Sequence, residues 1–305
     1  MGARIVVIGS CNTDMVVQLP RLPAPGETVL GGTFLTAQGG KGANQAVAAA
    51  RAGGTVAFIG RVGDDAFGRE ARNALQKEGI DVSHLIIDPT APTGVALITV
   101  DARGENAIAV APGANAMVTP DDVERARDLI AGADILVAQL EVPVETVGAA
   151  AAVAAGAGVR TLLNPAPASP LDDGLLRNVA ILTPNEKEAA LISGMPVNDD
   201  NGIIAAAEAM RKRGVQRVIL TLGKRGIYFN DGILHVWMPA FHVRAVDTTA
   251  AGDVFTGAFA VALGEHQLPI DAARFACAAS AISVTRPGAQ PSAPYRTEIE
   301  ALLSD

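Results

Sequence analysis

The chain has 305 residues, a formal net charge of -8 at pH 7, and a composition that is 49% hydrophobic but only 4% aromatic. A chain of this length buries about three quarters of its unfolded surface, so its core needs no disulfide or metal. The acidic balance argues against general nucleic-acid binding, which relies on Lys and Arg to neutralise phosphates. Few aromatic side chains are available for base stacking.

The sequence shows no sign of export or membrane insertion. Met1 to Arg4 lead straight into an apolar segment, without the basic region, apolar core and cleavage site of a signal peptide. The longest run without a polar side chain, 147–159, is shorter than the about 20 residues that span a membrane. Cys11 and Cys277 have no metal-ligand spacing, so we expect a cytoplasmic protein with two free thiols.

Short β-branched runs alternate with alanine-rich helical stretches along most of the chain. A helix is predicted over 65–78, where apolar residues share one face and Gly79 follows as a C-terminal cap. Another helix is predicted to start at Thr119, which precedes a proline and two carboxylates. The alternation predicts an α/β fold with a mainly parallel sheet covered by helices on both faces. The predicted strands are 5–8, 55–59, 135–140, 159–163, 181–183 and 218–221.

Two stretches, 27–37 and 93–110, interrupt this order with strand-like segments separated by turn residues. We expect one domain over 1–305 with a small β sheet inserted in it, formed by about 14–38 and 93–110 and placed to act as a lid. Edge hairpins without a role are the alternative. Residues 228–232 carry the signal of a hairpin turn.

The common nucleotide and hydrolase motifs are absent from the sequence. It contains neither G-x-x-x-x-G-K-[ST] nor a G-x-G-x-x-G that opens a helix after a strand, which disfavours the P-loop and dinucleotide folds. It also lacks H-E-x-x-H, G-x-S-x-G and C-x-x-C. The four histidines are scattered, which gives little support to a His-rich metal site or a Ser–His triad.

A first glycine-rich segment, 39–45 (Gly-Gly-Lys-Gly-Ala-Asn-Gln), leads into a helical run over 46–52. Glycines let a ligand approach the backbone closely, and the start of a helix offers free N–H groups. Lys41 and Asn44 add polar donors. The segment suits a small hydroxylated or anionic ligand; a tight turn with a solvated lysine is the alternative.

A second segment, 247–253 (Asp-Thr-Thr-Ala-Ala-Gly-Asp), precedes the apolar helix predicted over 254–263. Small residues at a helix start leave its N–H groups free for an anion. If a phosphoryl group docks there, Asp253 lies beside the point of transfer and can accept a proton from an attacking hydroxyl. An ordinary capping aspartate is the alternative.

Polar residues also follow predicted strands. Asn12-Thr13-Asp14 come after the first strand, and Glu141 ends another. In open α/β sheets, ligands bind beyond the carboxyl ends of strands, and these side chains can bond vicinal hydroxyls. Loop capping is the alternative for each residue alone.

Together, these segments resemble the ribokinase-like (phosphofructokinase-B type) carbohydrate kinases over nearly the whole chain. Each motif is weak alone, but five in the same order as in that family are improbable by chance. The motifs are 39–45, 183–186 (Thr-Pro-Asn-Glu), 221–226 (Thr-Leu-Gly-Lys-Arg-Gly), 247–253 and 288–292 (Gly-Ala-Gln-Pro-Ser).

The resemblance implies an ATP-dependent kinase that phosphorylates the 5-hydroxyl of D-ribose. It makes Asp253 the catalytic base, with the amides of Ala251, Gly252 and Asp253 as an anion hole. The implied sugar contacts are Asn12, Asp14, Gly40, Lys41, Asn44, Glu141 and Asp253.

The resemblance also implies nucleotide and ion sites, with ATP, Mg²⁺ and K⁺ as cofactors and Glu188 linked to Mg²⁺ and phosphate. The implied nucleotide contacts are Asn185, Glu188, Thr221, Gly223, Gly226, Gly252 and Cys277. The implied monovalent-cation site comprises Asp247, Thr249, Ser283, Arg286, Gly288 and Ser292.

The resemblance further implies a homodimer formed through the β lid. Within the family, another small sugar (deoxyribose or fructose) or a nucleoside is the alternative substrate. A sugar sensor without turnover and a purely structural α/β module are the alternatives from other classes. The presence of Asp253, Gly252 and Glu188 together argues against the sensor.

Overall fold

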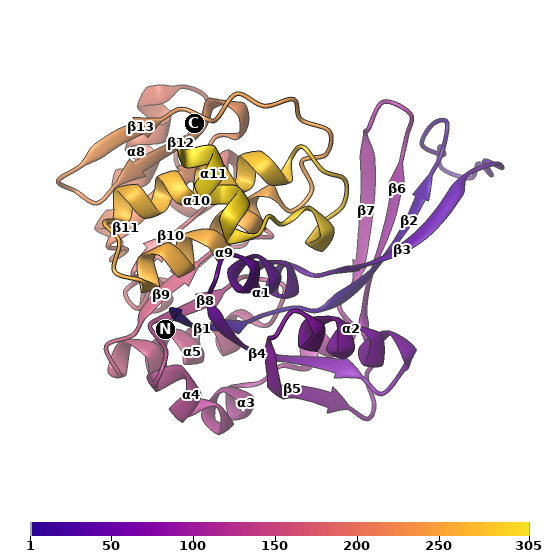
Figure 1. Cartoon of the computed structure of the whole chain (residues 1–305), viewed down its shortest axis with the longest axis horizontal. Helices are drawn as coiled ribbons and strands as arrows, with labels where there is room; N and C mark the ends of the chain where they lie inside the picture. Colours follow the sequence, from indigo (N-terminus) through magenta and orange to yellow (C-terminus); the bar gives the residue numbers. More distant parts are fainter. Residues whose placement is uncertain (1, 305) are drawn as a thin grey trace.

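Nine strands form the main sheet of the structure, a computed structural model that describes residues 2–304 (Figure 1). The strand order is β13-β12-β11-β10-β9-β8-β1-β4-β5, and every pair is parallel except β11–β12 and β12–β13. The strands are β1 (Arg4–Ile8), β4 (Thr55–Gly63), β5 (Asp81–Asp88), β8 (Ile135–Ala138), β9 (Arg160–Leu163), β10 (Ile181–Leu182), β11 (Arg217–Thr221), β12 (Ile227–Asn230) and β13 (His235–Met238).

Eleven α-helices are assigned within residues 2–304, and those packed on the sheet cover both of its faces. They are α1 (Lys41–Arg51), α2 (Ala66–Lys77), α3 (Pro120–Arg125), α4 (Arg127–Ala131), α5 (Val144–Gly156), α6 (Asp173–Leu176), α7 (Glu186–Ser193), α8 (Asp200–Lys212), α9 (Ala251–Gly264), α10 (Pro269–Ser283) and α11 (Arg296–Ser304). The predicted α/β class is confirmed. Within the described part of the chain, no helix combines the length and the apolar character needed to cross a bilayer.

The predicted strands are all present, and their ends differ from the prediction by one residue at β1, β9, β10 and β11, by two at β8 and by four at β4. β8 stops at Ala138 because Leu140 instead bonds the carbonyl of Ala166, in the loop after β9. β5 was not predicted. The predicted hairpin exists, but 228–230 belong to β12 and the turn lies at 231–234, where Asp231 accepts hydrogen bonds from two backbone N–H groups.

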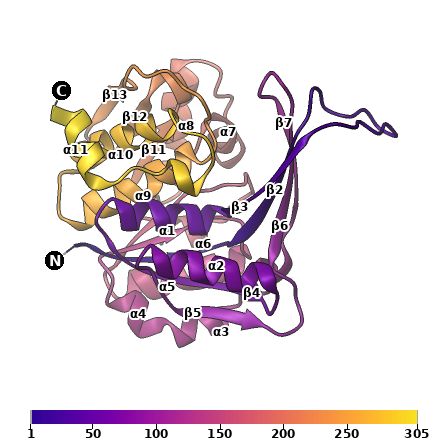
Figure 2. The ribbon, with the colours of Figure 1, turned by 45° about the vertical axis from the view of Figure 1, so that its right-hand side comes forward.

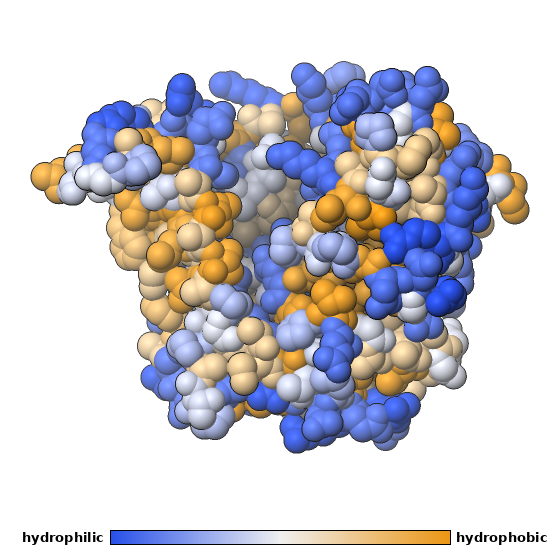
Figure 3. All heavy atoms as spheres, turned by 180° about the vertical axis from the view of Figure 1, so that it is seen from behind, coloured by the Kyte–Doolittle hydropathy of each residue, from blue (hydrophilic) through white to orange (hydrophobic). Residues whose placement is uncertain are grey.

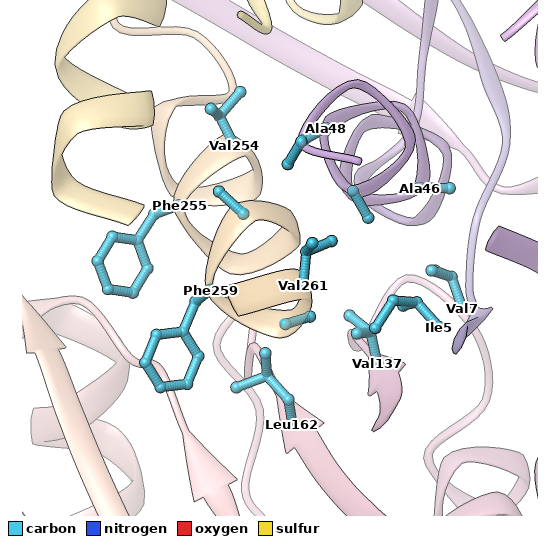
Figure 4. Close-up of a cluster of buried hydrophobic side chains, with 14 of the residues drawn as sticks. Ile5, Val7, Ala46, Ala48, Val137, Leu162, Val254, Phe255, Phe259 and Val261 are labelled. Atoms are coloured by element: carbon cyan, nitrogen blue, oxygen red, sulfur yellow. The ribbon is translucent and has the colours of Figure 1, made fainter. Parts of the chain in front are cut away.

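Alternate residues of each buried strand face two separate apolar cores. In β1, Ile5 and Val7 point into the core under α1, α2, α9, α10 and α11, whereas Val6 and Ile8 point into the core under α3–α8. Figure 4 shows the first core, where Val137 and Leu162 of the sheet lie beneath α9. α1 and α9 pack so closely that a side chain at Gly257 would sit 2.5 Å from a backbone oxygen of α1. This packing places the starts of the two helices side by side.

Four further strands form a second sheet that projects from the main body (Figure 2). They are β2 (Asn12–Gln18), β3 (Thr33–Gly39), β6 (Gly94–Val100) and β7 (Asn106–Ala111), in the order β3-β2-β6-β7. The two interrupting stretches of the sequence therefore lie in one sheet. Its base is fastened to the body by Asp65, which caps α2 and also accepts hydrogen bonds from the backbone N–H and the hydroxyl of Thr93, at 2.8 and 2.7 Å.

Candidate active site

The starts of α1 and α9 meet at the carboxyl ends of β1, β8 and β9. Gly40, just before α1, has φ 87°, a left-handed conformation that favours glycine. A Cβ there would lie 2.8 Å from the backbone nitrogen of Asn12. The glycine-rich segment therefore packs directly on the chain that follows β1, which joins two of the predicted sugar-binding segments.

Asp253 is buried in the first turn of α9 and faces two amides of α1. Its two carboxylate oxygens accept hydrogen bonds from Asn44 Nδ2 at 3.1 Å and from Gln45 Nε2 at 2.9 Å. Burial raises the pKa of Asp253, while the positive charge of Lys41 and these two hydrogen bonds oppose that rise. A buried carboxylate with a raised pKa is the expected state of a general base.

Two more carboxylates stand around Lys41. Burial, followed by the charges of Glu141 and Asp253, raises the pKa of Asp14 to about 6, and Lys41 lowers it. Glu141 accepts hydrogen bonds from Ser10 Oγ at 2.6 Å and from the backbone nitrogen of Lys41 at 3.0 Å. The pKa of Lys41 is itself raised, chiefly by Asp253. One ammonium therefore stabilises a group of carboxylates in their charged form.

Asn12 is buried beside Asn115, which lies just after β7. Asn115 Nδ2 donates to Asn12 Oδ1 at 2.7 Å, and the Asn115 side chain also bonds the backbone N–H and carbonyl of Cys11. Because the side-chain oxygen of Asn12 accepts from Asn115, the side-chain NH₂ group of Asn12 is left to donate to another partner. The structure therefore brings Asn12, Asp14, Lys41, Asn44, Glu141 and Asp253 into one connected region.

The start of α9 has no side-chain cap. Ala250 adopts the left-handed conformation, with φ 59°, and the backbone N–H groups of Gly252 and Asp253 find no acceptor among residues 2–304. Such free donors at a helix start, aided by the helix dipole, suit an anion.

A cavity of about 360 Å³ opens beside this helix start. Its wall combines residues of the segment 221–226, Lys224 among them, with apolar side chains such as Phe255 and Val243. Burial raises the pKa of the Cys277 thiol to about 12, so this residue lines the wall as a neutral group. The predicted residues that line the cavity are Thr221, Gly223, Gly226, Ala251, Gly252 and Cys277.

Asn185 and Glu188 do not line this cavity but form a capping box at the start of α7. Asn185 accepts from the backbone of Glu188 at 2.9 Å, and Glu188 accepts from the backbone and side chain of Asn185, both at 2.8 Å. Asn185 is also bridged to Thr221, which does line the cavity. Burial raises the pKa of Glu188, which Lys41 opposes.

The residues predicted to hold a monovalent cation lie on two joined loops. Asp247 accepts hydrogen bonds from the backbone N–H groups of Thr249 and Gly288, at 2.9 and 2.8 Å, and thereby ties the loop before α9 to the loop after α10. Arg286 is paired with Glu298. The Ser283 and Ser292 hydroxyls donate to the carbonyls of Ser280 and Ala289. Within residues 2–304, no group of three or more His, Cys, Asp and Glu side chains is arranged to hold a metal.

The profile of the pfkB family carbohydrate kinases matches residues 3–296. The chain belongs to this family. It is 44% identical over 298 residues to a ribokinase of Haemophilus influenzae (98% of this chain, 97% of the relative) and 38% identical over 304 residues to a deoxyribokinase of Salmonella typhimurium (98% of both). The structure of Arabidopsis thaliana ribokinase complexed with ribose and ATP covers 100% of both chains with a TM-score of 0.91 and 34% identity.

The site also contains buried polar residues that the sequence analysis gave no role. They follow strands or begin helices, where the rule of ligand binding at the carboxyl ends of strands could have found them. These residues are Ser10 after β1, Gln45 in α1, Asn115 after β7, Gln139 after β8 and Asn164 after β9. They contact the backbone and side chains of the site and none of them is charged, so no charge pattern in the sequence marks them.

We expect Lys41→Met to destabilise the folded chain more at pH 7.5 than at pH 5. A carboxyl whose folded-state pKa is raised weakens the fold as the pH rises through that pKa, and losing Lys41 raises the pKa of Asp14 and Asp253 further. We expect a loss of about 3 kcal/mol in the free energy of unfolding at pH 7.5. Urea titrations at both pH values measure it.

Lys77→Met, which removes an exposed lysine at the end of α2, is the matched control and should change stability little at either pH. If Lys41→Met lowered the free energy of unfolding equally at both pH values, Lys41 would not be stabilising charged carboxylates at this site.

Proposed function

We propose that this chain is an ATP-dependent kinase that transfers the γ-phosphoryl group to O5 of D-ribose, giving D-ribose 5-phosphate and ADP. The observation that carries the proposal is the place of the Asp253 carboxylate. On one side, the carboxylate contacts the side-chain amides of Asn44 and Gln45. On the other side are the free backbone N–H groups at the start of α9. The family and the ribose-bound and ATP-bound relative support the same reaction.

In the proposed reaction, the sugar hydroxyls bind to Asn12, Asp14, Gly40, Lys41, Asn44 and Glu141. Asp253 accepts the proton of the 5-hydroxyl as the bond from O5 to the γ-phosphorus forms and the bond from that phosphorus to the β–γ bridging oxygen breaks. A sugar hydroxyl has a pKa far above 7, so the base contributes only as bonding to phosphorus develops. Most of the barrier is lowered by positioning and by the amides of Gly252 and Asp253 facing the phosphoryl oxygens. The N–H of Ala251, predicted as a third donor, already donates to the carbonyl of Thr248 at 3.3 Å.

We propose that the cavity beside α9 holds the nucleotide. Thr221, Gly223, Gly226, Gly252 and Cys277 line it together with apolar side chains, and Lys224 and His242 also border it. A largely apolar wall with a few polar groups suits the flat base of a nucleotide. Asn185 and Glu188 lie next to it, through the bridge from Asn185 to Thr221.

The carboxylate of Glu188 suits a Mg²⁺ ion that it contacts through water molecules bound to the ion. Both oxygens of Glu188 already accept from Asn185, and Mg²⁺ retains several of its waters when bound in proteins. When bound, Mg²⁺ supplies positive charge that neutralises the phosphates.

Deoxyribose is the second candidate substrate, because one relative is a deoxyribokinase at 38% identity. Fructose and nucleosides are weaker candidates. The carboxylates and amides of the site can bond hydroxyls that several of these compounds share.

We expect Asp253→Asn to lower the rate of ribose phosphorylation by about 10²- to 10⁴-fold, because the variant loses the base. Coupled ADP release with ribose, deoxyribose, fructose and a nucleoside measures the rate and ranks the substrates. Asp128→Asn, an exposed aspartate on α4, is the control. A rate within a few-fold of wild type for Asp253→Asn would refute the mechanism, and sugar binding without turnover in wild type would indicate a sensor.

We propose that the chain is one kinase domain in which the projecting sheet acts as a lid. By register, Asp14, Leu35, Ile98 and Ile108 share one face of this sheet, which is the face of the site residues. Figure 3 shows the surface hollowed between this sheet and the main body. Closure of the sheet over that hollow would exclude water, which otherwise competes with the sugar as phosphoryl acceptor.

We propose a cytoplasmic location, and both cysteines are buried free thiols.

We propose that the opposite face of the lid pairs with a second copy of the chain. Phe34 and Leu97 lie on that face and are 60% and 56% exposed. Exposed apolar patches of this kind mark interfaces.

We expect Leu97→Glu to shift the chain from dimer to monomer in sedimentation velocity, because a carboxylate cannot be buried there without a partner. Leu268→Glu, on a leucine that is 67% exposed outside the sheet, should leave the dimer intact. A wild-type chain that is monomeric at all concentrations would rule the dimer out.

We propose a K⁺ site on the loops joined by Asp247, comprising Asp247, Thr249, Ser283, Arg286, Gly288 and Ser292. The backbone carbonyls of these loops and the negative charge of Asp247 would attract the potassium ion. The positive charge of Arg286 does not oppose this, because Arg286 is paired with Glu298. The Asp247 bridge fixes the loop that leads into the free amides of α9.

We expect ribose phosphorylation to be several-fold faster in potassium chloride than in tetramethylammonium chloride at equal ionic strength. Asp247→Asn should reduce this difference, since it removes the charge that attracts the cation. Equal rates of the wild type in the two salts would overturn the proposed site.

A further inference from the structure

A chain of buried amide side chains lies behind Asp253, and nothing in the proposed reaction uses it. Gln45 and Gln139 are fully buried and Asn164 is 7% exposed. Gln139 follows β8, Asn164 follows β9, and Gln45 projects from α1, so three elements contribute to one hydrogen-bonded network.

The hydrogen bonds of this network have a fixed direction. Gln139 Nε2 donates to Gln45 Oε1 at 2.7 Å. Gln45 Nε2 then donates both of its hydrogens, one to Asn164 Oδ1 at 3.1 Å and one to Asp253 Oδ1 at 2.9 Å. Asn164 Nδ2 donates onward to the carbonyl of Thr183 at 3.0 Å. Because a backbone carbonyl accepts from the Asn164 nitrogen, the Asn164 oxygen faces Gln45, so the Gln45 nitrogen must face both that oxygen and the carboxylate. The Gln45 oxygen then accepts from Gln139, whose own Oε1 has no partner within residues 2–304.

The surrounding backbone leaves this network little room to move. A Cβ at Gly9 would collide with the side-chain oxygen of Gln139, so the backbone after β1 lies directly against that amide. α9 meets the backbone of Gln45 at Gly257, as described above. The amides are therefore held at fixed positions by three packed elements.

We propose that Gln45 is a positioning residue that fixes one carboxylate oxygen of Asp253 and favours its charged form, and that Asn164, with Gln139 donating from the other side, holds Gln45 in this orientation. The inference rests on the proposed function for its catalytic meaning. The geometry itself does not depend on the identity of the sugar.

The charged groups around Asp253 define the expected effect. Lys41 of α1 favours the carboxylate, whereas Glu141 after β8, Asp14 of β2 and Glu188 of α7 disfavour it. Asn44 and Gln45 favour it by hydrogen bonding. Removing the Gln45 donor therefore raises the pKa of Asp253, and the acidic limb of the pH–rate profile moves to higher pH.

The test compares wild type with Gln45→Met, which keeps the volume of the side chain and removes the donor. Carboxyl titration is followed by NMR on protein labelled with ¹³C at aspartate, and the signal lost in Asp253→Asn identifies the resonance. The pH dependence of kcat/KM for ribose is measured at saturating ATP in the same buffers. We expect both midpoints to rise by about one pH unit.

Thr146→Val is the matched control. Thr146 is fully buried in α5 and donates one hydrogen bond, to the carbonyl of Val118, so its replacement removes buried hydrogen bonding away from Asp253, whereas Gln45→Met removes three bonds. We expect a lower melting temperature but unchanged titration midpoints. If Gln45→Met does not fold, Gln139→Met provides the second test, because it removes the donor that polarises the Gln45 amide and should raise the midpoint by less.

The outcomes separate the inference from the proposed function. A raised NMR midpoint in a chain that phosphorylates none of the sugars supports the role of Gln45 and refutes the proposed reaction. An active wild type whose midpoints are unchanged by Gln45→Met, or by Gln139→Met where the first variant does not fold, overturns the role of Gln45.

Discussion

The site depends on the close packing of α1 against α9. Alanine and glycine on the facing sides let the two helices approach to the point where Gly257 leaves no space for a side chain against the backbone of Gln45. That approach brings Asn44 and Gln45 within hydrogen-bond distance of Asp253. A bulkier residue at 257 would separate the helices, and the buried carboxylate would lose both of its donors. The composition of these helices, rich in small residues, is therefore a requirement of the site as well as of the core.

The charge distribution of the site explains how an acidic chain can bind a nucleotide with several phosphates, as proposed. A chain with a net charge of -8 is poorly suited to bind polyanions by charge alone. Here, backbone N–H groups at the start of α9 face the position proposed for the phosphates, and they carry no formal charge. The formal charges of the site are instead mostly negative and gathered around Lys41, where sugar hydroxyls can donate to them. Neutral donors for the phosphates and acidic acceptors for the sugar give the two substrates different environments a short distance apart.

The sequence allowed the fold class and most of the site segments to be predicted, because both depend on local patterns. Strand–helix alternation identified the sheet, and glycine-rich segments before helices identified the starts of α1 and α9. The alternation over 81–88 went unrecognised, so β5 was missed. The amide network could not be predicted, because its bonds join residues such as Gln45 and Asp253 that are 208 positions apart. Neutral amides leave no charge pattern to mark them, and only the packing of α1, β8 and β9 reveals which of them meet.

The same strand carries two residues of the site and continues into the projecting sheet, so the site and that sheet share one piece of backbone. Asn12 and Asp14 begin β2, which continues outward as a central strand of the projecting sheet. Asn115 fixes Asn12 and the backbone of Cys11 at this same end of the sheet, where the edge strand β7 returns to the body. Asp65 fastens Thr93 at the start of β6. With its base held at these points, Asn12 stays with the main body, whereas Asp14 lies two residues farther along β2. In the proposed closure of the lid, a sugar bound by both residues would connect the main body to the projecting sheet.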